Sequence, residues 1–181
     1  MEGFEIRVDD DIVLRLHQEK VASLLFELVE KNRTHFREWL PWLDVNTKIE
    51  DTKKFIAGVE DNYKKGLSLN LGIYYQDKII GALGFNVIEN TNKKAEIGYV
   101  LDKDSYGNGI MTKSCKALIN YGFNELDLNR IEIKAAVENT KSRAIPERLG
   151  FKQEGILQQG EFLYDHFVDV AVYGMLKENW K

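Results

Sequence analysis

The sequence predicts a single α/β domain, or more narrowly an α+β domain, that is built on a mixed sheet. Three observations support this prediction. The length of 181 residues fits one domain, which we take to span residues 1–181. A block of alternating apolar residues in the middle of the chain indicates consecutive strands joined by short turns. Segments with helical periodicity precede this block and alternate with the later strands.

The chain is expected to begin with a strand and then to form helices. Residues 12–16 (IVLRL) read as a short strand. A helix should follow, because five apolar residues recur at the spacing of one helix face: Val21, Leu24, Leu25, Leu28 and Val29. Residues 36–43 then form a short aromatic segment that contains Trp39 and Trp42.

A second helix is expected after the aromatic segment. Thr47 and Glu50 have the spacing of a capping box at its start. Gly66 suits its C-terminal end, because glycine readily takes the left-handed conformation there. The apolar positions of this helix are Ile49, Ile56, Val59 and Tyr63.

The middle of the chain is expected to form a meander of three strands. Apolar and smaller or polar residues alternate over residues 67–75, which indicates the first strand. Residues 76–78 then make a turn, and residues 79–87 return as the second strand. Residues 94–101 form the third strand.

The last part of the chain should alternate helices with strands. The core face of the next helix is expected to consist of Cys115, Leu118, Ile119, Gly122 and Phe123. Residues 131–137 alternate like a strand, and a short helical segment ends at Gly150. Strands near 151–158 and 166–176 close the chain.

Composition and charge exclude several classes of protein. Hydrophobic residues make up 44% and charged residues 30% of the chain, which is ordinary for a globular protein and excludes a disordered or collagen-like one. The net charge of -4 argues against binding to nucleic-acid phosphates as the main role. One cysteine cannot form an internal disulfide, which fits a reducing cytoplasm. No apolar run approaches the ~18 residues of a membrane span, and the acidic first residues do not resemble a signal peptide.

A glycine-rich turn after the third meander strand is a candidate phosphate cradle. It spans residues 104–112 and contains Gly107 and Gly109. Glycines let the backbone approach a ligand closely, and a helix that starts there directs its free N–H groups and the positive end of its dipole at one spot. Taken alone the pattern is weak, because a tight strand-to-helix turn also uses glycines. It matches neither the dinucleotide fingerprint nor the P-loop.

Together with a second motif, this turn resembles the Gcn5-related N-acetyltransferase (GNAT) superfamily. The pyrophosphate loop of that superfamily has the form Gln/Arg-x-x-Gly-x-Gly/Ala, which is similar to Asp104, Gly107 and Gly109 here. Its second motif has the form Asn-x-x-Ser/Ala-(x)7-Gly-Phe, which matches Asn139, Ser142, Gly150 and Phe151. Residues 39–42, 95–100 and 139–151 further resemble the RimJ/RimL branch, which acetylates the N-termini of ribosomal proteins.

The resemblance covers nearly the whole chain and implies both a fold and a cosubstrate. The fold would be a mixed, mostly antiparallel central sheet of about six or seven strands flanked by helices. The cosubstrate would be acetyl-CoA, whose pantetheine arm inserts where the third meander strand splays from the strand at 131–137. A backbone N–H between Tyr99 and Leu101 would hold the carbonyl oxygen of the thioester. The residues expected to contact acetyl-CoA are Tyr99, Val100, Leu101, Tyr106, Gly107, Asn108, Gly109, Ile110, Met111, Asn139 and Ser142.

Two residues depart from the superfamily pattern. Asp104 stands where Gln or Arg is usual, at a position that mainly offers its backbone. Pro146 stands where many members carry a tyrosine general acid, so an enzyme must place that chemistry elsewhere. Pro146 also cannot donate a hydrogen bond to the carbonyl of Ser142 four residues earlier, and we expect the helix to be distorted there.

Acetyl transfer to an amine requires a base, an oxyanion donor and a proton for the leaving sulfur. An α-amine has a pKa near 7.7–8, so a carboxylate is a sufficient base at neutral pH. Glu161 matches the position proposed for the base in the RimL branch, although a loop glutamate can also be simply solvated. Glu96 on the third meander strand is the other candidate, with a structural hydrogen-bonding role as its alternative. Ser142 can donate to the sulfur or can cap its helix.

The remaining candidates are aromatic residues, histidines and the cysteine. Trp39 and Trp42 can belong to the core or can form the walls of an acceptor groove. Cys115 lies on an apolar helix face and is expected to be a buried structural thiol. The three histidines show no metal-ligand spacing, so no metal is expected: His17, His35 and His166.

The sequence therefore favours a cytoplasmic, acetyl-CoA-dependent N-acetyltransferase that acts on the N-terminal amine of a protein, with a ribosomal protein as the best candidate. The acidic and basic residues of segment 33–44 balance, which favours a peptide over a polycation. Acetylation of a small amine such as a polyamine or aminoglycoside remains an alternative, as does a non-catalytic acyl-CoA-binding module. No nucleic-acid or membrane partner is expected, and formation of a homodimer is left open.

Overall fold

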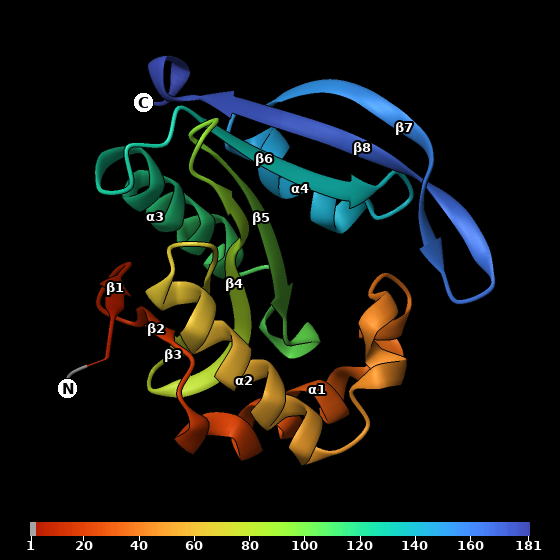
Figure 1. Ribbon diagram of the computed structural model, residues 1–181. Helices are drawn as coiled ribbons and strands as arrows, with labels where there is room; N and C mark the ends of the chain where they lie inside the picture. The colour runs from red at the N-terminus through yellow and green to blue at the C-terminus, as the bar shows by residue number, and fades with distance from the viewer. Residues whose placement is uncertain (1–2) are drawn as a thin grey trace.

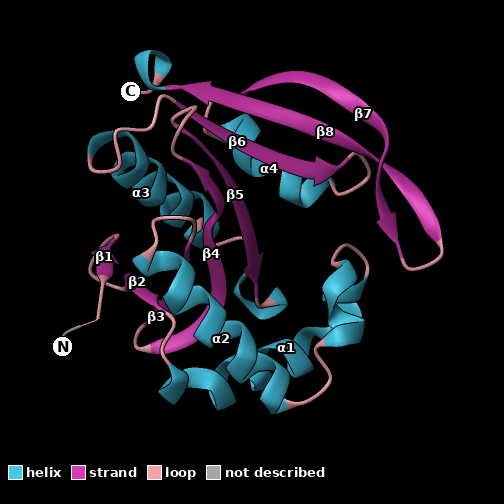
Figure 2. Cartoon of the chain, viewed as in Figure 1, coloured by secondary structure: helices cyan, strands magenta, loops and turns pink. Residues whose placement is uncertain are grey.

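The computed structural model describes residues 3–181 and contains an eight-stranded sheet with helices on both of its faces (Figures 1 and 2). The strand order is β1-β2-β3-β4-β5-β6-β8-β7, and every neighbouring pair is antiparallel except β5 and β6. The strands are β1 (Glu5–Arg7), β2 (Ile12–Leu16), β3 (Leu69–Tyr75), β4 (Lys78–Glu89), β5 (Lys94–Leu101), β6 (Arg130–Ala136), β7 (Lys152–Leu163) and β8 (His166–Leu176).

Four α-helices and four short 3-10 helices connect the strands. None of the helices in residues 3–181 has both the length and the hydropathy that a membrane span needs. The α-helices are α1 (Ala22–Arg37), α2 (Ile49–Lys64), α3 (Ile110–Asn124) and α4 (Thr140–Arg148). The 3-10 helices are η1 (Glu19–Val21), η2 (Pro41–Val45), η3 (Lys103–Ser105) and η4 (Lys177–Asn179).

The mixed, mostly antiparallel sheet and the order of elements are confirmed. The sheet has one strand more than the sequence indicates, because β1 is only three residues long and shows no usable period. The last hairpin is also longer than expected, since β7 continues past residue 158 to Leu163. The aromatic segment runs from the end of α1 into η2, which Pro41 begins.

Three details of the first helices and strands differ from the prediction. Leu24 is 50% exposed, because the stripe that α1 buries instead runs through Ala22, Leu25, Leu28, Val29, Asn32 and Phe36. The predicted capping box at Thr47 and Glu50 lies one residue too early, since the N-cap is Lys48 and the capping carboxylate is that of Asp51. Helix α2 begins at Ile49, and the carboxylate of Asp51 accepts hydrogen bonds from the N–H groups of Thr47 and Lys48, each at 3.2 Å. Leu67 lies before β3 and is 47% exposed.

The two faces of the sheet bury different sets of side chains. On one face the predicted apolar side of α3 packs against the strands, and Cys115, Leu118 and Ile119 are fully buried there. On the other face α1 and η2 contribute a cluster of Val29, Phe36 and Leu43. Successive residues of β5 join these different clusters, since Tyr99 packs on the α3 side and Val100 on the α1 side. The end of β5 is thereby fixed between helices on both faces.

The sheet splits between β5 and β6. The parallel pairing of these strands covers Lys94–Ile97 and ends at the contact between Ile97 and Ile133. Beyond that point β5 stays with β4 as far as Leu101, and β6 stays with β8 as far as Ala136. This is the splay that the family resemblance implies, and it leaves one edge of β5 without a strand partner.

The β7–β8 hairpin reaches across to the first helices (Figure 1). Tyr164 in its turn donates a hydrogen bond to the carbonyl of Leu40, and the guanidinium of Arg37 lies 3.8 Å from the centre of the Tyr164 ring. This contact links the C-terminal hairpin to the segment between α1 and η2. The opening at the split between β5 and β6 is consequently bounded on its far side by these two segments.

Candidate functional site: a cleft at the split sheet

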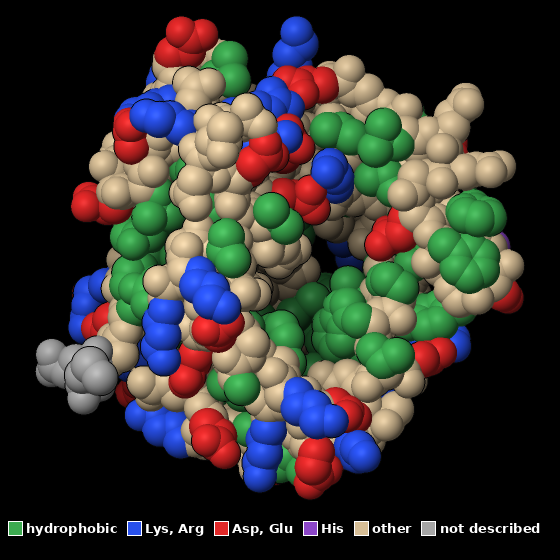
Figure 3. Space-filling model, viewed as in Figure 1, with side chains coloured by type: hydrophobic (Ala, Val, Ile, Leu, Met, Phe, Trp, Pro, Cys, Tyr) green, Lys and Arg blue, Asp and Glu red, His purple; other side chains and the backbone are tan. Residues whose placement is uncertain are grey.

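A cleft of about 840 Å³ lies at the split between β5 and β6. Figure 3 shows a dark hollow near the middle of the molecular face, with apolar side chains along its rim. The end of β5, the glycine-rich turn, and the first turns of α3 and α4 line the cleft, together with the end of α1. The predicted residues that line it are Trp39, Tyr99, Val100, Leu101, Tyr106, Gly107, Gly109, Ile110, Met111, Asn139 and Ser142.

The glycine-rich turn has the geometry of an anion cradle. Gly107 and Gly109 adopt φ values of +83° and +69°, which L side chains rarely take. A Cβ at either position would meet nothing within 4 Å, so both glycines face open space. The first hydrogen bond of α3 runs from the N–H of Lys113 to the carbonyl of Gly109 at 3.0 Å. The N–H groups of the preceding turn therefore have no partner within the helix and are free for a ligand.

Three basic residues that sequence reasoning missed surround this cradle. Lys113, Lys141 and Arg148 all line the cleft, although the Lys113 ammonium is paired with Asp9 at 2.8 Å. Arg148 donates a hydrogen bond to the Thr112 hydroxyl at 3.0 Å, and the Lys141 ammonium lies 5.3 Å from the centre of the Tyr106 ring. Their positive charge suits a pyrophosphate at the cradle. Lys141 and Arg148 lie inside the second sequence motif, which is the signal that could have found them.

The departure at Asp104 has a structural explanation. Its carboxylate pairs with Lys31 of α1 at 2.8 Å instead of facing the cradle. Lys31 also pairs with the buried Asp102 at 2.5 Å. The side chain of Asn32 accepts a hydrogen bond from the N–H of Lys103 at 3.1 Å. Helix α1 thus holds the start of the glycine-rich turn in place, and the ion pair between Asp104 and Lys31 is one of the contacts that do so.

The free edge of β5 turns backbone donors toward the cleft. The N–H of Asp102 donates to the carbonyl of Ile80 on β4 at 2.7 Å. Backbone N–H groups alternate between the two edges of a strand. The N–H groups of Tyr99 and Leu101 consequently point to the opposite edge, where β6 has separated. This is the range of β5 in which a donor for a carbonyl oxygen was expected.

Helix α4 presents Ser142 to the cleft. The side chain of Asn139 accepts a hydrogen bond from the N–H of Ser142 at 3.1 Å, so Asn139 and not Ser142 caps the helix. Helix α4 continues through Pro146 to Arg148, so the proline does not end it. The hydroxyl of Tyr99 donates instead to the carbonyl of Ser142 at 2.8 Å. The Ser142 hydroxyl lies 3.4 Å from the same phenol oxygen.

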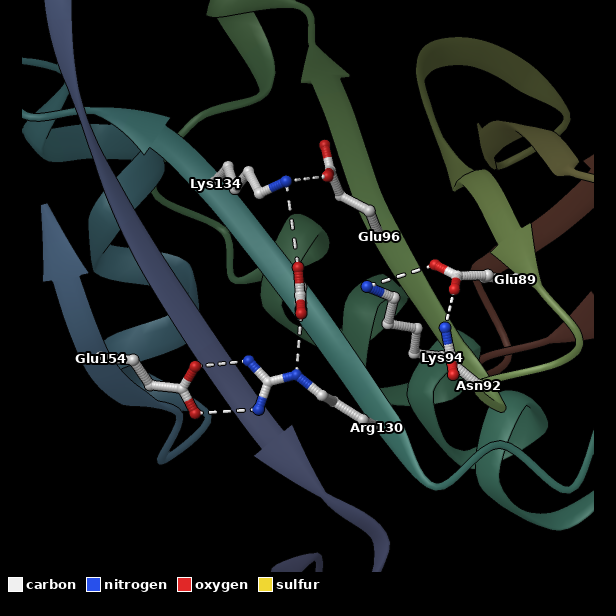
Figure 4. A network of polar contacts seen from close by, with 8 residues as sticks. Glu89, Asn92, Lys94, Glu96, Arg130, Lys134 and Glu154 are labelled. Atoms are coloured by element: carbon white, nitrogen blue, oxygen red, sulfur yellow. Dashed lines mark hydrogen bonds and ion pairs between the residues drawn. The ribbon is translucent and has the colours of Figure 1, made fainter. Parts of the chain in front are cut away.

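The two candidate base residues lie on different strands, Glu96 on β5 and Glu161 on β7, and in different electrostatic surroundings. Glu96 accepts a hydrogen bond from Lys134 at 2.6 Å, as part of a network along β6 that reaches Arg130 and Glu154 (Figure 4). Glu161 is half-buried, and among residues 3–181 its carboxylate has no hydrogen-bond or ion-pair partner. Burial, and then the negative charge of Glu96, raise the pKa of Glu161 above the usual range of a glutamate.

Four predicted residues do not line the cleft itself. Glu96 and Glu161 are absent from its lining, and Asn108 is exposed on the glycine-rich turn, where its amide contacts the Tyr106 carbonyl at 3.4 Å. Trp42 is 39% exposed on η2, so it does not belong to the core.

The histidines and the cysteine lie in different surroundings. Within residues 3–181 no cluster of His, Cys, Asp and Glu has the arrangement of a metal site. His35 lines the cleft and its Nε2 lies 2.6 Å from the Tyr106 hydroxyl. His17 is buried, and burial lowers its pKa to about 4. Cys115 is completely buried as expected, and burial raises the pKa of its thiol.

Comparison with known families agrees with this geometry. Residues 11–152 match the model of the acetyltransferase (GNAT) domain. The chain belongs to the GNAT acetyltransferase family. It is an acetyl-CoA-dependent N-acetyltransferase, as the sequence motifs predict, and the split sheet, glycine cradle and basic rim of the cleft suit that cosubstrate.

Its relatives include enzymes of the RimJ/RimL branch. The ribosomal-protein-serine acetyltransferase of Escherichia coli is 36% identical over 94% of this chain and 96% of its own. The structure of RimL, the ribosomal L7/L12 α-N-protein acetyltransferase, in complex with coenzyme A superposes with a TM-score of 0.93 at 34% identity, covering 96% of this chain and 98% of RimL.

A further neighbour with the same fold carries the acetyl donor itself. The microcin C7 self-immunity acetyltransferase MccE, in complex with acetyl-CoA and AMP, has a TM-score of 0.89 at 32% identity, covering 93% of this chain and 94% of MccE. Two proteins with folds similar to this chain, RimL and MccE, therefore bind coenzyme A and acetyl-CoA respectively. The resemblance to the RimJ/RimL branch is confirmed.

Proposed function

We propose that the acceptor is the α-amine of a protein N-terminus, and that the protein is ribosomal. The observation that carries this proposal is the composition of the acceptor end of the cleft. Trp39 and Leu40 form an apolar wall there, and the nearby charges of Arg37 and Asp44 neutralise each other at 2.9 Å. A peptide start has one amine and one or two small side chains, which such a wall accommodates. The names of the Escherichia coli relative and of RimL support the same acceptor.

Acetyl-CoA supplies the acetyl thioester, and the chain supplies the groups that hold it. The glycine turn and the first turn of α3 would hold the pyrophosphate with backbone N–H groups, with Lys113, Lys141 and Arg148 adding positive charge. The N–H of Tyr99 or that of Leu101 would donate to the carbonyl oxygen, on which negative charge develops during the reaction. These donors belong to a strand fixed on both faces, so they need little rearrangement.

Two side chains would move the protons of the reaction. The amine nitrogen forms a bond to the acetyl carbon as the bond from that carbon to sulfur breaks. Glu161 takes the proton from the amine, directly or through a water molecule, because its carboxylate is unpaired and its pKa is raised. Ser142 donates a hydrogen bond to the departing sulfur. Glu96, which is held by Lys134, serves to tune the charge near Glu161.

We expect the enzyme to acetylate short peptides that begin with Ser or Ala, and to turn over spermidine and kanamycin-like amines slowly. A polycation needs a site rich in unpaired carboxylates, whereas the carboxylate of Asp44 near this wall is paired with Arg37. The measurement is kcat/KM for the peptides beside the two amines, followed by release of the free CoA thiol. A peptide with an acetylated N-terminus is the matched control and should release none.

A polycation preferred by tenfold or more, which corresponds to ~1.4 kcal/mol in transition-state binding, contradicts the protein-acceptor proposal. If none of the tested amines leads to release of the CoA thiol, although acetyl-CoA binds tightly, the result would instead point to a binding module. A ribosomal acceptor also places the reaction in the cytoplasm, in agreement with a free, buried cysteine.

The β7–β8 hairpin leads us to extend the proposal to a homodimer. β7 is the edge strand of the sheet, and large apolar side chains are about half exposed along this hairpin: Ile156, Leu157, Phe162 and Phe167. An exposed edge with apolar side chains favours pairing with another chain. Sedimentation velocity of the purified chain is expected to give the mass of two copies, and Phe167→Asp is expected to give the mass of one. A single copy at every concentration would contradict this extension.

A further inference from the structure

The proline in α4 leaves one backbone carbonyl without its helical donor. In an α-helix the carbonyl of Ser142 would accept a hydrogen bond from the N–H of residue 146, but Pro146 has no N–H. The neighbouring residues keep the pattern, since Arg143 donates to Asn139 at 3.0 Å and Leu149 donates to Ile145 at 3.1 Å. The carbonyl that lacks a helical donor is therefore that of Ser142, which also lines the cleft.

A phenol from the sheet supplies the missing donor. The hydroxyl of Tyr99 on β5 donates to the Ser142 carbonyl at 2.8 Å. Tyr99 can reach α4 because β5 has lost its pairing with β6 two residues earlier, at Ile97. Burial raises the pKa of the Tyr99 phenol above its usual range, which favours the protonated form that donates this hydrogen bond.

The same phenol also determines where the Ser142 hydroxyl points. A phenol has one proton, and the proton of Tyr99 is used on the Ser142 carbonyl. Its oxygen can then only accept from the Ser142 hydroxyl, which lies 3.4 Å away. The serine hydroxyl has one proton, so it must rotate from Tyr99 toward the cleft, which both residues line, before it can donate to a sulfur there. The Tyr99 hydroxyl also connects α4 to the strand whose N–H groups face the split.

We propose that Tyr99 is a positioning residue that replaces the helical donor lost at Pro146 and thereby holds Ser142 in place for the departing sulfur. The proposal rests on the function proposed above for Ser142. It assigns no proton transfer to Tyr99 itself. Tyr99 and Pro146 form a matched pair in which the phenol compensates for the proline.

The pairing of Tyr99 with Pro146 is tested by a double-mutant cycle. Tyr99→Phe keeps the ring in the core and removes only the hydroxyl. We expect it to lower kcat by roughly tenfold, in the lower part of the range for groups that assist proton transfer, and to leave KM for acetyl-CoA within about twofold. Pro146→Ala restores an N–H that can donate to the Ser142 carbonyl. In the Tyr99→Phe background it is expected to return kcat to within about threefold of wild type.

A second tyrosine provides the matched control. Tyr173 on β8 also contacts α4 through its hydroxyl, which lies 2.8 Å from both Arg143 and Glu147, but it does not line the cleft. Tyr173→Phe is expected to lower the melting temperature with little change in kcat. Restoration of its melting temperature by Pro146→Ala is not expected, because the carbonyl of Ser142 is not involved.

The outcomes separate this proposal from the proposed function. If Tyr99→Phe keeps wild-type kcat, or if Pro146→Ala fails to rescue it, the proposal is overturned. Failure to rescue together with a changed basic limb of the pH profile would make Tyr99 a proton donor instead. If the wild-type protein acetylates no amine, the proposed function fails. Melting temperatures of the variants then test whether Tyr99 compensates for Pro146. The proposal then requires Tyr99→Phe to cost less in melting temperature when residue 146 is alanine, and an equal cost overturns it.

Discussion

Gly109→Val is expected to abolish acetyl-CoA binding, with an affinity at least roughly a hundredfold lower, while the chain still folds. Gly109 precedes α3 with φ at +69°, and a β-branched residue strongly resists that conformation. Its Cβ would project into open space, where nothing lies within 4 Å. A valine there both occupies the approach to the free N–H groups and turns them away. Calorimetric titration with acetyl-CoA measures the effect, and thermal unfolding establishes that the variant is folded.

Gly150→Val is the matched control for this prediction. Gly150 follows α4 with φ at +76°, and a Cβ there would also meet nothing within 4 Å. The backbone strain is therefore comparable, but Gly150 does not line the cleft. We expect this variant to lose stability and to keep its affinity for acetyl-CoA. Equal affinities of the two folded variants would show that the glycine turn is not the cradle.

The elements with strong periodicity could be predicted from the sequence with little error. The strand at residues 94–101 has the predicted bounds, and the buried face of α3 is the predicted one. Errors occurred where local signals compete. Both Thr47–Glu50 and the pair of Lys48 and Asp51 have capping-box spacing, and the start of α2 at Ile49 selects the second. Leu24 has an apolar side chain but lies off the stripe that meets the sheet.

The glycine turn could be predicted because it depends on local backbone geometry. Gly107 and Gly109 both adopt the positive φ expected of glycines within one turn of chain. The arrangement of the candidate acid–base residues could not be predicted, because it depends on contacts between elements that are distant in the sequence. Lys134 reaches Glu96 from 38 residues away, and Tyr99 reaches the carbonyl of Ser142 from 43 residues away. No spacing rule within the sequence reports such pairs, so the choice between Glu96 and Glu161 stayed open.

Glu161→Gln is expected to lower kcat by roughly a hundredfold, the usual loss when a general base is removed. Glutamine keeps the size of the side chain and cannot take up the amine proton. Glu96→Gln is the matched substitution on β5 and is expected to lower kcat much less, because Glu96 is engaged by Lys134 at 2.6 Å. Both variants should bind acetyl-CoA like wild type, since neither residue lines the cleft. If Glu96→Gln is inactive and Glu161→Gln is normal, the order of the two carboxylates is reversed.

The pH dependence of kcat/KM tests whether Glu161 is the general base. A general base must be deprotonated, so kcat/KM should fall as the pH falls through the pKa of Glu161, and burial with the charge of Glu96 places that fall above the usual glutamate range. Glu96→Gln removes the like charge and is expected to move the acid limb to lower pH. Lys134→Met leaves the charge of Glu96 unpaired and is expected to move the limb to higher pH. Shifts in opposite directions in these two variants identify Glu161 as the group that titrates, whereas an acid limb that neither substitution moves would exclude it as the base.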